Sequence, residues 1–240
     1  MPSSNQLLAG LAKRDLALIR SSLEPVRLLA NEVLEPRSSR VGYVYFVQSG
    51  LVSVVGMTKP NHRIEVGMIG SEGMTGLAVV LGDDRSANET LVQSSGTALR
   101  LHPQALREAM RASTALTERL LRYTHVFMIQ GSQTAVANGR GKLSERLARW
   151  LAMWRDRLPV DDLTITHEFL SILLGVRRPG VTIAINELEG RGLLKATRTR
   201  VKIMDREGLR KAANGFYGVP EAEYLRLLGP RVRRPKTLAG

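Results

Sequence analysis

The spacing of apolar residues changes twice along the chain. Leucines and one isoleucine at helical intervals in the first 22 residues predict one or two short helices. From about Leu28 to Leu101, short apolar runs alternate with glycines, which is typical of an antiparallel β-roll or barrel. The runs YVYFVQSGLVSVV and TLVQSSGTALRL are each expected to be two strands around a Ser-Gly turn.

Helical spacing returns after the β-rich segment. Pro103 suits a first helical turn, so a short helix is expected to reach Arg111. A longer helix is predicted over 113–137, with side chains at alternating intervals of four and three that form a coiled-coil seam. The seam consists of Leu116, Leu120, Tyr123, Phe127, Gln130, Thr134 and Ala137. Two interpretations remain open, self-association along this face or packing of the helix on its own barrel.

A break and another helix follow. Asn138-Gly139-Arg140-Gly141 is expected to act as a hinge between two domains. The segment 142–157 is amphipathic, and its Trp150 and Trp154 are expected in the core.

The most specific pattern lies in residues 162–203. Counting from His167, the small residue Ser171 is fifth and Gly175 is ninth. Apolar residues fill the positions that two crossed helices must bury, namely Leu170, Leu174, Val176, Val181 and Ala184. Gly175 can adopt the positive φ that ends the first helix, and Ser171 allows the second helix to approach. A helix-turn-helix is predicted, with a second helix from Arg178 to Glu189; the alternative is an ordinary packed helix pair.

The segment LLKATRTRVKIMD after Gly192 predicts a β-hairpin. Lys195, Arg198, Arg200 and Lys202 lie in and around its turn. A basic hairpin directly after a helix-turn-helix is a wing suited to phosphate contacts.

Charge supports a polyanionic partner. The 240 residues carry a net charge of +13. Residues 1–137 hold 14 Lys and Arg against 11 Asp and Glu, or +3, while residues 138–240 hold 21 against 11, or +10. The excess therefore lies with the helix-turn-helix, and binding should weaken with salt. An anionic membrane would also suit this charge, but no long apolar run or signal peptide is evident, so a cytoplasmic protein without a membrane partner is expected.

Several chemistries are disfavoured. The absence of Cys excludes disulfides, thiolate zinc sites and Cys-ligated iron–sulfur clusters. The four His are not spaced as ligand pairs, so no metal site is expected. No GxxxxGK[ST], GxSxG or HExxH motif is present, so no catalytic residues are assigned and the chain is not expected to be an enzyme. A basic interaction module for an acidic protein is a further alternative, which sequence-selective duplex binding would separate from a regulator.

The order of barrel, long helix, hinge and winged helix-turn-helix resembles the Crp/Fnr superfamily of bacterial transcription regulators over about residues 7–218. The resemblance is carried mainly by THEFLSILLGVRRPGVTIAINELEGRGLL and the wing. It implies an α+β fold with an N-terminal antiparallel, jelly-roll-like β-roll with flanking helices, a long dimerisation helix and a C-terminal winged helix-turn-helix. The expected boundaries are 1–112 for the sensor, 113–138 for the dimerisation helix, 139–218 for the DNA-binding domain and 219–240 for a tail.

The resemblance also implies partners and contact residues. It implies a homodimer on a palindromic site in double-stranded DNA near a promoter, acting through RNA polymerase. The expected DNA contacts are Thr166, His167, Arg177, Arg178, Gly180, Thr182, Lys195, Arg198 and Arg200. Arg178 matches a position that reaches a guanine edge. Pro179 and Ile183 replace a Glu and a second Arg that are frequent in the family, so a different half-site is expected.

An effector site is expected in the β-roll. In the cyclic-nucleotide branch of the family, a Gly-Glu pair holds the ribose and an Arg-Ser or Arg-Thr pair holds the cyclic phosphate. The corresponding residue types here occur in Gly70-Ser71-Glu72-Gly73 and Arg85-Ser86. The expected contacts to cyclic AMP or cyclic GMP are Glu72, Arg85, Ser86, Ser132 and Thr134. The alternative is a vestigial pocket in an effector-independent regulator, with Arg85 paired to Asp83 or Asp84.

Overall fold

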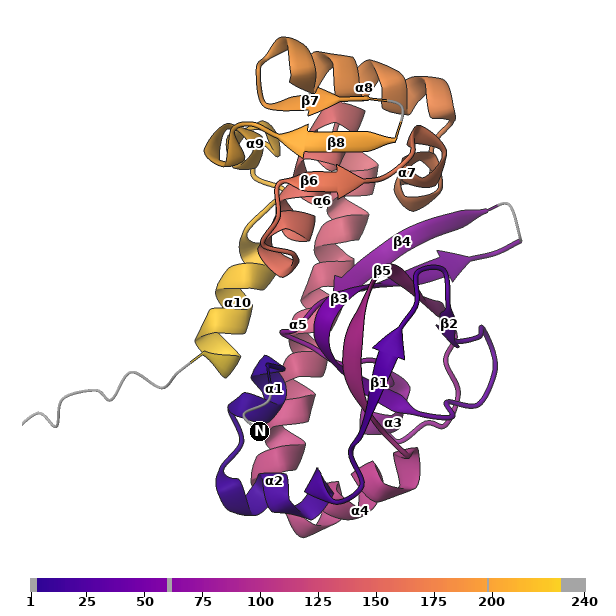
Figure 1. The fold of residues 1–240 in the computed structure, drawn as a ribbon, viewed down its shortest axis with the longest axis vertical. Helices are drawn as coiled ribbons and strands as arrows, with labels where there is room; N and C mark the ends of the chain where they lie inside the picture. The colour runs from indigo at the N-terminus through magenta and orange to yellow at the C-terminus, as the bar shows by residue number, and fades with distance from the viewer. Residues whose placement is uncertain (1–3, 60–61, 198, 230–240) are drawn as a thin grey trace, which may run out of the picture.

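The computed structural model describes residues 4–59, 62–197 and 199–229. Two short helices, α1 (Gln6–Ala9) and α2 (Lys13–Arg20), precede an antiparallel β-roll, as predicted. Its strands are β1 (Glu24–Leu28), β2 (Val33–Glu35), β3 (Val44–Met57), β4 (Arg63–Ile69) and β5 (Glu89–Leu101), with helix α3 (Leu77–Val80) between β4 and β5. The sheet order is β1-β5-β3-β4, and β2 pairs with β5 (Figure 1).

The two Ser-Gly segments are not turns, which corrects the expectation. β3 and β5 are single long strands that pair with each other, and the register shifts around Ser49 and Leu51. Gly50 has φ +85°, and a Cβ there would lie 2.6 Å from the Ser94 carbonyl oxygen. A Cβ on Gly96 would lie 2.1 Å from the Ser49 carbonyl oxygen. The glycines thus allow a bulge and a close approach inside continuous strands.

The expected seam of the long helix is wrong as a dimer contact. Helix α4 (Pro103–Ala112) leads into α5 (Thr114–Arg140), whose first seam side chains pack in one apolar cluster with Val44 and Phe46 of the β-roll. Leu116, Leu120 and Tyr123 are buried inside the single chain. Gln130 is tied to the roll, because its Oε1 accepts the Met68 N–H at 2.6 Å. The alternative of a helix packed on its own barrel is correct for this face, because the β-roll supplies the apolar partner surface.

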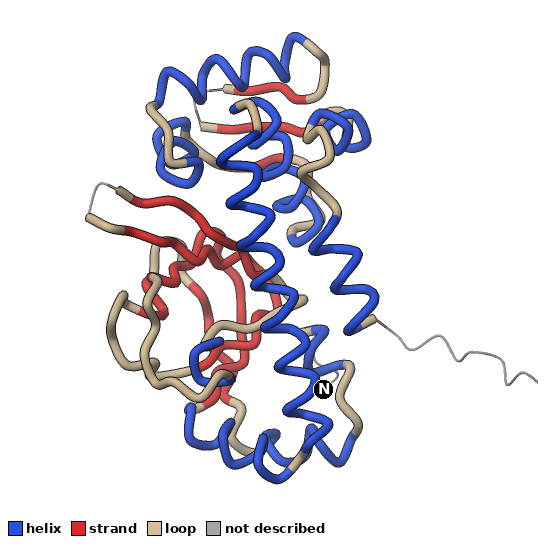
Figure 2. The backbone as a smooth tube through the Cα atoms, turned by 180° about the vertical axis from the view of Figure 1, so that it is seen from behind, coloured by secondary structure: helices blue, strands red, loops and turns tan. Residues whose placement is uncertain are grey.

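A different face of α5 is open. Figure 2 shows α5 running uncovered between the β-roll and the C-terminal helix. Six exposed residues of this face follow intervals of four and three, namely Leu121, His125, Met128, Ser132, Ala135 and Gly139. Leu121 is 42% exposed and Met128 is 61% exposed. We name these six residues the outer seam.

The break after α5 is shorter than the expected hinge. Residues 138–140 remain helical, and the chain turns at Gly141 and Lys142 before α6 (Leu143–Arg157). Glu145 accepts the Lys142 N–H at 2.8 Å and so caps the start of α6. Trp150 and Trp154 are buried in the core, as expected.

The C-terminal half contains the predicted winged helix-turn-helix. Helices α7 (His167–Leu174) and α8 (Arg178–Gly190) are followed by β7 (Leu194–Ala196) and β8 (Arg200–Ile203), then by α9 (Arg206–Ala212). Strand β6 (Asp162–Thr164), which the sequence did not indicate, pairs with β8 and completes a sheet of order β6-β8-β7. The sheet ties the wing to the segment that enters α7.

Part of the expected tail is a helix. α10 (Val219–Leu228) returns from the C-terminal half to lie along α5 (Figure 1). Its Leu228 is buried in the same cluster as Leu7, Leu8 and Ile19. Residues 230–240 lie outside the described part of the chain. The helix has only ten residues and carries Pro220 in its first turn, so its residue pattern predicts a helix only weakly.

The two halves share one buried cluster. Leu51 and Met68 of the β-roll belong to the same apolar cluster as Leu147 and Leu151 of α6. Strand β4 also contacts α7, where a Cβ on Gly175 would lie 2.8 Å from Ile64 Cδ1. The position of the helix-turn-helix is therefore coupled to the β-roll by direct packing.

Candidate nucleic-acid interface

The turn between α7 and α8 depends on Gly175. Its φ is +63°, and the N–H groups of Gly175 and Val176 donate to the carbonyl oxygens of Ile172 (3.1 Å) and Ser171 (2.9 Å). This backbone pattern closes α7 in the left-handed region, which glycine adopts without strain. At the other end, Thr166 Oγ1 accepts the Phe169 N–H at 3.1 Å and caps α7.

The first turn of α8 projects into solvent. Arg177, Arg178 and Pro179 are all exposed. Arg177 occupies the N-cap position, and its side chain caps none of the helix N–H groups. Pro179 is tolerated because the first turn of a helix has no intrahelical partner for its nitrogen. Two long cations are thus presented at the positive end of the helix dipole.

Thr182 and His167 lie behind this turn. The His167 Nδ1 is 3.1 Å from Thr182 Oγ1, which also lies 3.4 Å from the Arg178 carbonyl oxygen. Both residues are half-buried, and His167 Nε2 is buried without a hydrogen-bond partner among the described residues. The pair links the start of α7 to the first turns of α8, so it positions Arg178.

Gly180 has a packing role that sequence reasoning missed. A Cβ at this position would lie 3.1 Å from Leu143 Cδ2. The glycine therefore faces α6 and allows α8 to pack closely against it, although it was expected to face DNA. The exposed Ile183, at 69%, was not expected as a contact residue. Helical spacing alone would place an isoleucine in the core, but Ile183 stands where the Crp/Fnr resemblance has an arginine, and that position is the signal that could have found it.

The wing carries further cations. Lys195 on β7 lies opposite Lys202 on β8, and both side chains are exposed. Arg200 is exposed, and its Nη1 lies 3.7 Å from Asp162 Oδ2 on the neighbouring strand β6. Arg198 lies outside the described residues. The observed wing thus offers two adjacent lysines beside the reading helix.

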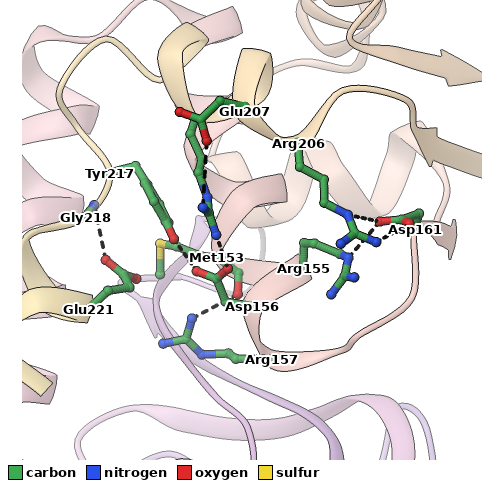
Figure 3. Close-up of polar contacts among 11 residues, drawn as sticks. Met153, Arg155, Asp156, Arg157, Asp161, Arg206, Glu207, Tyr217, Gly218 and Glu221 are labelled. Atoms are coloured by element: carbon green, nitrogen blue, oxygen red, sulfur yellow. Dashed lines mark hydrogen bonds and ion pairs between the residues drawn. The ribbon is translucent and has the colours of Figure 1, made fainter. Parts of the chain in front are cut away.

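Other arginines of this half are held by the chain's own carboxylates (Figure 3). Asp161 accepts from Arg155 Nε at 2.7 Å and from Arg206 Nε at 2.9 Å. These hydrogen bonds, that from Arg206 first, lower the pKa of Asp161 to about 2. In contrast, Arg177, Arg178 and the two wing lysines pair with none of the described carboxylates. Four exposed cations without an ion pair among the described residues therefore lie at the start of α8 and on the wing.

The expected effector residues are not gathered into one pocket. Glu72 forms an ion pair of 2.7 Å with Arg157 of α6. Arg85 donates to the Ser38 carbonyl oxygen at 3.1 Å and lies 3.9 Å from Asp84. Ser86 donates to the Asn88 carbonyl oxygen at 2.8 Å. Each of these side chains is therefore engaged by another part of the chain: Glu72 by α6, Arg85 by Ser38 and Asp84, and Ser86 by Asn88.

The two helical candidates are also engaged elsewhere. Ser132 is an exposed member of the outer seam, and its hydroxyl donates to the Met128 carbonyl oxygen at 3.0 Å. Thr134 Oγ1 donates to the Gln130 carbonyl oxygen at 2.9 Å and accepts from Arg149 Nη2 at 3.1 Å. Both side chains therefore bond within α5 or to α6.

The carboxylate of Glu35 accepts a backbone hydrogen bond at the start of α3. Glu35 Oε1 accepts the Gly76 N–H at 2.5 Å, and Oε2 accepts from the Thr90 hydroxyl at 3.1 Å. Burial raises the pKa of Glu35, and hydrogen bonds from Thr75, Thr90, Gly76 and Ser86 oppose that rise. Because the Ser86 hydroxyl already donates to the Asn88 carbonyl oxygen and Arg85 is engaged by Ser38 and Asp84, these residues do not fit a bound cyclic phosphate.

The described residues contain no group of three or more His, Asp or Glu placed to hold a metal ion. Among the same residues, no helix combines the length and apolar character needed to cross a bilayer.

Comparison with known proteins identifies the C-terminal half. Residues 145–212 match the Crp-like helix-turn-helix domain. No curated protein matches the chain in sequence. The chain therefore carries a Crp-like helix-turn-helix domain, as its sequence predicted.

Solved structures share the whole fold. A Crp/Fnr-family protein from Eubacterium rectale aligns over 87% of this chain and 98% of its own, with 16% identity and a TM-score of 0.68. FixK2 from Bradyrhizobium japonicum aligns over 79% and 96%, with 17% identity and a TM-score of 0.68. The c-di-GMP-responsive regulator CLP from Xanthomonas campestris aligns over 80% and 99%, with 16% identity and a TM-score of 0.65.

The β-roll, long helix and winged helix-turn-helix are therefore arranged as in Crp/Fnr regulators.

Proposed function

We propose that this protein is a dimeric transcription regulator that binds palindromic promoter sites in double-stranded DNA. The observation that carries the proposal is the exposed first turn of α8, where Arg177 and Arg178 are free of ion pairs. A helix with its N-terminal turn exposed in this way can enter the major groove, while Lys195 and Lys202 of the wing contact phosphates.

Dimerisation is proposed through the outer seam. Its 4-3 spacing is that of a coiled coil, and two of its members, Leu121 and Met128, are large apolar side chains left in water. Side chains shorten to Ser132, Ala135 and Gly139 towards the DNA-binding half, which allows two helices to approach closely there. A symmetric pair would present two copies of α8 to two half-sites about 34 Å apart.

The proposed role as a transcription regulator also implies a further partner and a cellular location. We infer a cytoplasmic protein that contacts RNA polymerase when bound near a promoter. We also propose the boundaries 1–112, 113–138 and 139–218 as sensor, dimerisation and DNA-binding units, with α10 connecting the last unit back to the first two.

Control by cyclic AMP or cyclic GMP is not favoured. The c-di-GMP-responsive regulator shares this fold, but here Arg85 is engaged by Ser38 and Asp84, and Glu72 by Arg157. We therefore propose a regulator that does not require either nucleotide. Calorimetric titration with both nucleotides should give no binding heat, and Arg85→Ala should leave DNA binding unchanged.

Selection of bound duplexes from a random library tests the main proposal. The expected result is a palindromic consensus whose binding weakens steeply as salt is raised, because condensed counterions are released. Binding to all duplexes with equal affinity, or binding only to acidic proteins, would contradict the proposal.

A further inference from the structure

Ile183 lies at the centre of the exposed face of α8. The opposite face of the helix is buried through Val181, Ala184, Ile185 and Leu188. Ile183 is 69% exposed, although every other isoleucine or leucine of this helix is in the core. The side chain therefore points away from the domain, in the direction that the reading helix presents to a partner.

Its surroundings on that face are polar apart from one neighbour. Pro179 lies one helical turn earlier and is also exposed. The two side chains form an apolar strip about 6 Å long, since an α-helix rises about 1.5 Å per residue. Thr182 and Asn186 flank Ile183 along the helix. An aliphatic strip of this size needs an apolar partner to lose its contact with water.

Only one such partner exists on a base edge in the major groove. The C5-methyl group of thymine is apolar, whereas guanine, adenine and cytosine present hydrogen-bond donors and acceptors there. Isoleucine can satisfy neither a donor nor an acceptor. A cytosine amino group facing Ile183 would lose its water without gaining a hydrogen bond, which disfavours that base.

We propose that Ile183, supported by Pro179, reads the methyl group of a thymine in each half-site. This inference rests on the proposed function. Ile183 follows Arg178 by about 7.5 Å of helix, and successive base pairs are about 3.4 Å apart, so the thymine lies within about two base pairs of the one that Arg178 contacts.

Replacement of thymine by deoxyuridine tests this contact, because it removes the methyl group alone. The selected duplex is prepared with one thymine per half-site replaced at a time, and its dissociation constant with the full-length protein is measured at constant salt. At one position, the wild-type protein should bind the uracil duplex about fourfold more weakly per half-site, from the value of one buried methyl-sized group.

Ile183→Ala should bind the thymine and uracil duplexes with equal affinity at that position. The matched control is Val160→Ala, since Val160 is 51% exposed and lies outside α8. This control should retain the fourfold preference for thymine. Both substitutions are at exposed positions, and thermal melts compare their folding with that of the wild type.

The outcomes distinguish a failure of thymine reading by Ile183 from a failure of the proposed regulator function. If the protein selects a palindrome but tolerates uracil at every position, thymine reading is overturned and the regulator stands. If Ile183→Ala keeps the preference for thymine, another residue reads the methyl group and the proposal is overturned. If no sequence is selected at all, the proposed function itself fails.

Discussion

The Trp150 indole of α6 donates a hydrogen bond of 2.8 Å from Nε1 to Glu65 Oε1 on strand β4. This contact joins the β-roll to the DNA-binding half, and Glu65 is 6% exposed. The hydroxyl of Ser53 lies 2.6 Å from Glu65 Oε2 and 2.8 Å from Gln93 Oε1. A hydroxyl has one proton, so it can donate to only one of these two oxygens. Below its pKa, the protonated Glu65 can donate to Ser53 Oγ, which leaves the Ser53 proton for Gln93 Oε1.

This network predicts a pH-dependent contact between the two halves. Burial raises the pKa of Glu65 to about 7 from its ordinary 4.5, despite opposing hydrogen bonds from Ser53 and Trp150. Because the folded-state pKa is the higher one, the stabilisation is complete below pH 4.5 and is lost as the pH rises through 7. The loss amounts to up to about 3 kcal/mol.

Glu65→Gln should therefore stabilise the protein at pH 8 and change its stability little at pH 5. The glutamine amide can donate to Ser53 Oγ as the protonated acid does. Thermal melts of both proteins from pH 5 to 8 measure the difference. Glu187→Gln, at an exposed position of α8, is the control and should show no such trend. A constant difference across this pH range would rule out a raised pKa at Glu65.

We predict that the outer seam of α5 forms the contact between the two copies of the dimer. Met128→Asp should weaken dimerisation at least about 100-fold, because association would bury two unpaired carboxylates in an apolar contact. Analytical ultracentrifugation across a concentration series measures the effect. Met204→Asp changes a methionine that is 49% exposed outside α5 and should leave the dimer intact. A Met128→Asp protein that remains dimeric would place the interface elsewhere.

Arg178 is predicted to read a base, and Lys202 is predicted to contact phosphate. Arg178→Ala should cost about 1–3 kcal/mol at one base pair of each half-site and relax the preference there. Lys202→Ala should weaken binding equally on all sequences and reduce the salt slope by about one. Titrations of matched and mismatched duplexes at several salt concentrations distinguish these effects. An equal loss on all duplexes for Arg178→Ala would make Arg178 a phosphate contact.

Gly175 is predicted to matter both for the turn and for the contact with the β-roll. Gly175→Ala forces a non-glycine residue to φ +63°, at a cost of about 1–2 kcal/mol, and brings a Cβ within 2.8 Å of Ile64 Cδ1. Gly192→Ala is the matched control, because Gly192 has φ +73° and open space around its Cβ position. Denaturant unfolding should show a larger loss for Gly175→Ala. Equal losses in the free energy of unfolding would mean that the contact between the new Cβ and Ile64 does not destabilise the protein further.

Local patterns predicted the DNA-binding half well. The positions of Gly175 and Ser171, the helical spacing of the apolar residues and the basic hairpin each constrain a structure within about 40 residues, so the sequence pattern indicated both helices and the wing. The same holds for the first helices and the glycine-punctuated β-roll, although the Ser-Gly segments proved to be bulges within long strands.

The sequence by itself determined the β-rich and helical regions of the chain, where positive charge gathers and which residues lead the reading helix, but not strand β6 or helix α10. The tertiary structure decided which face of α5 is free, because the β-roll covers the apolar face that resembled a dimer seam. It also decided that Gly180 faces α6, that Ile183 faces solvent and that Glu72 pairs with Arg157. Periodicity shows that a helix has a buried face, but only the packing of distant segments determines which surface covers it.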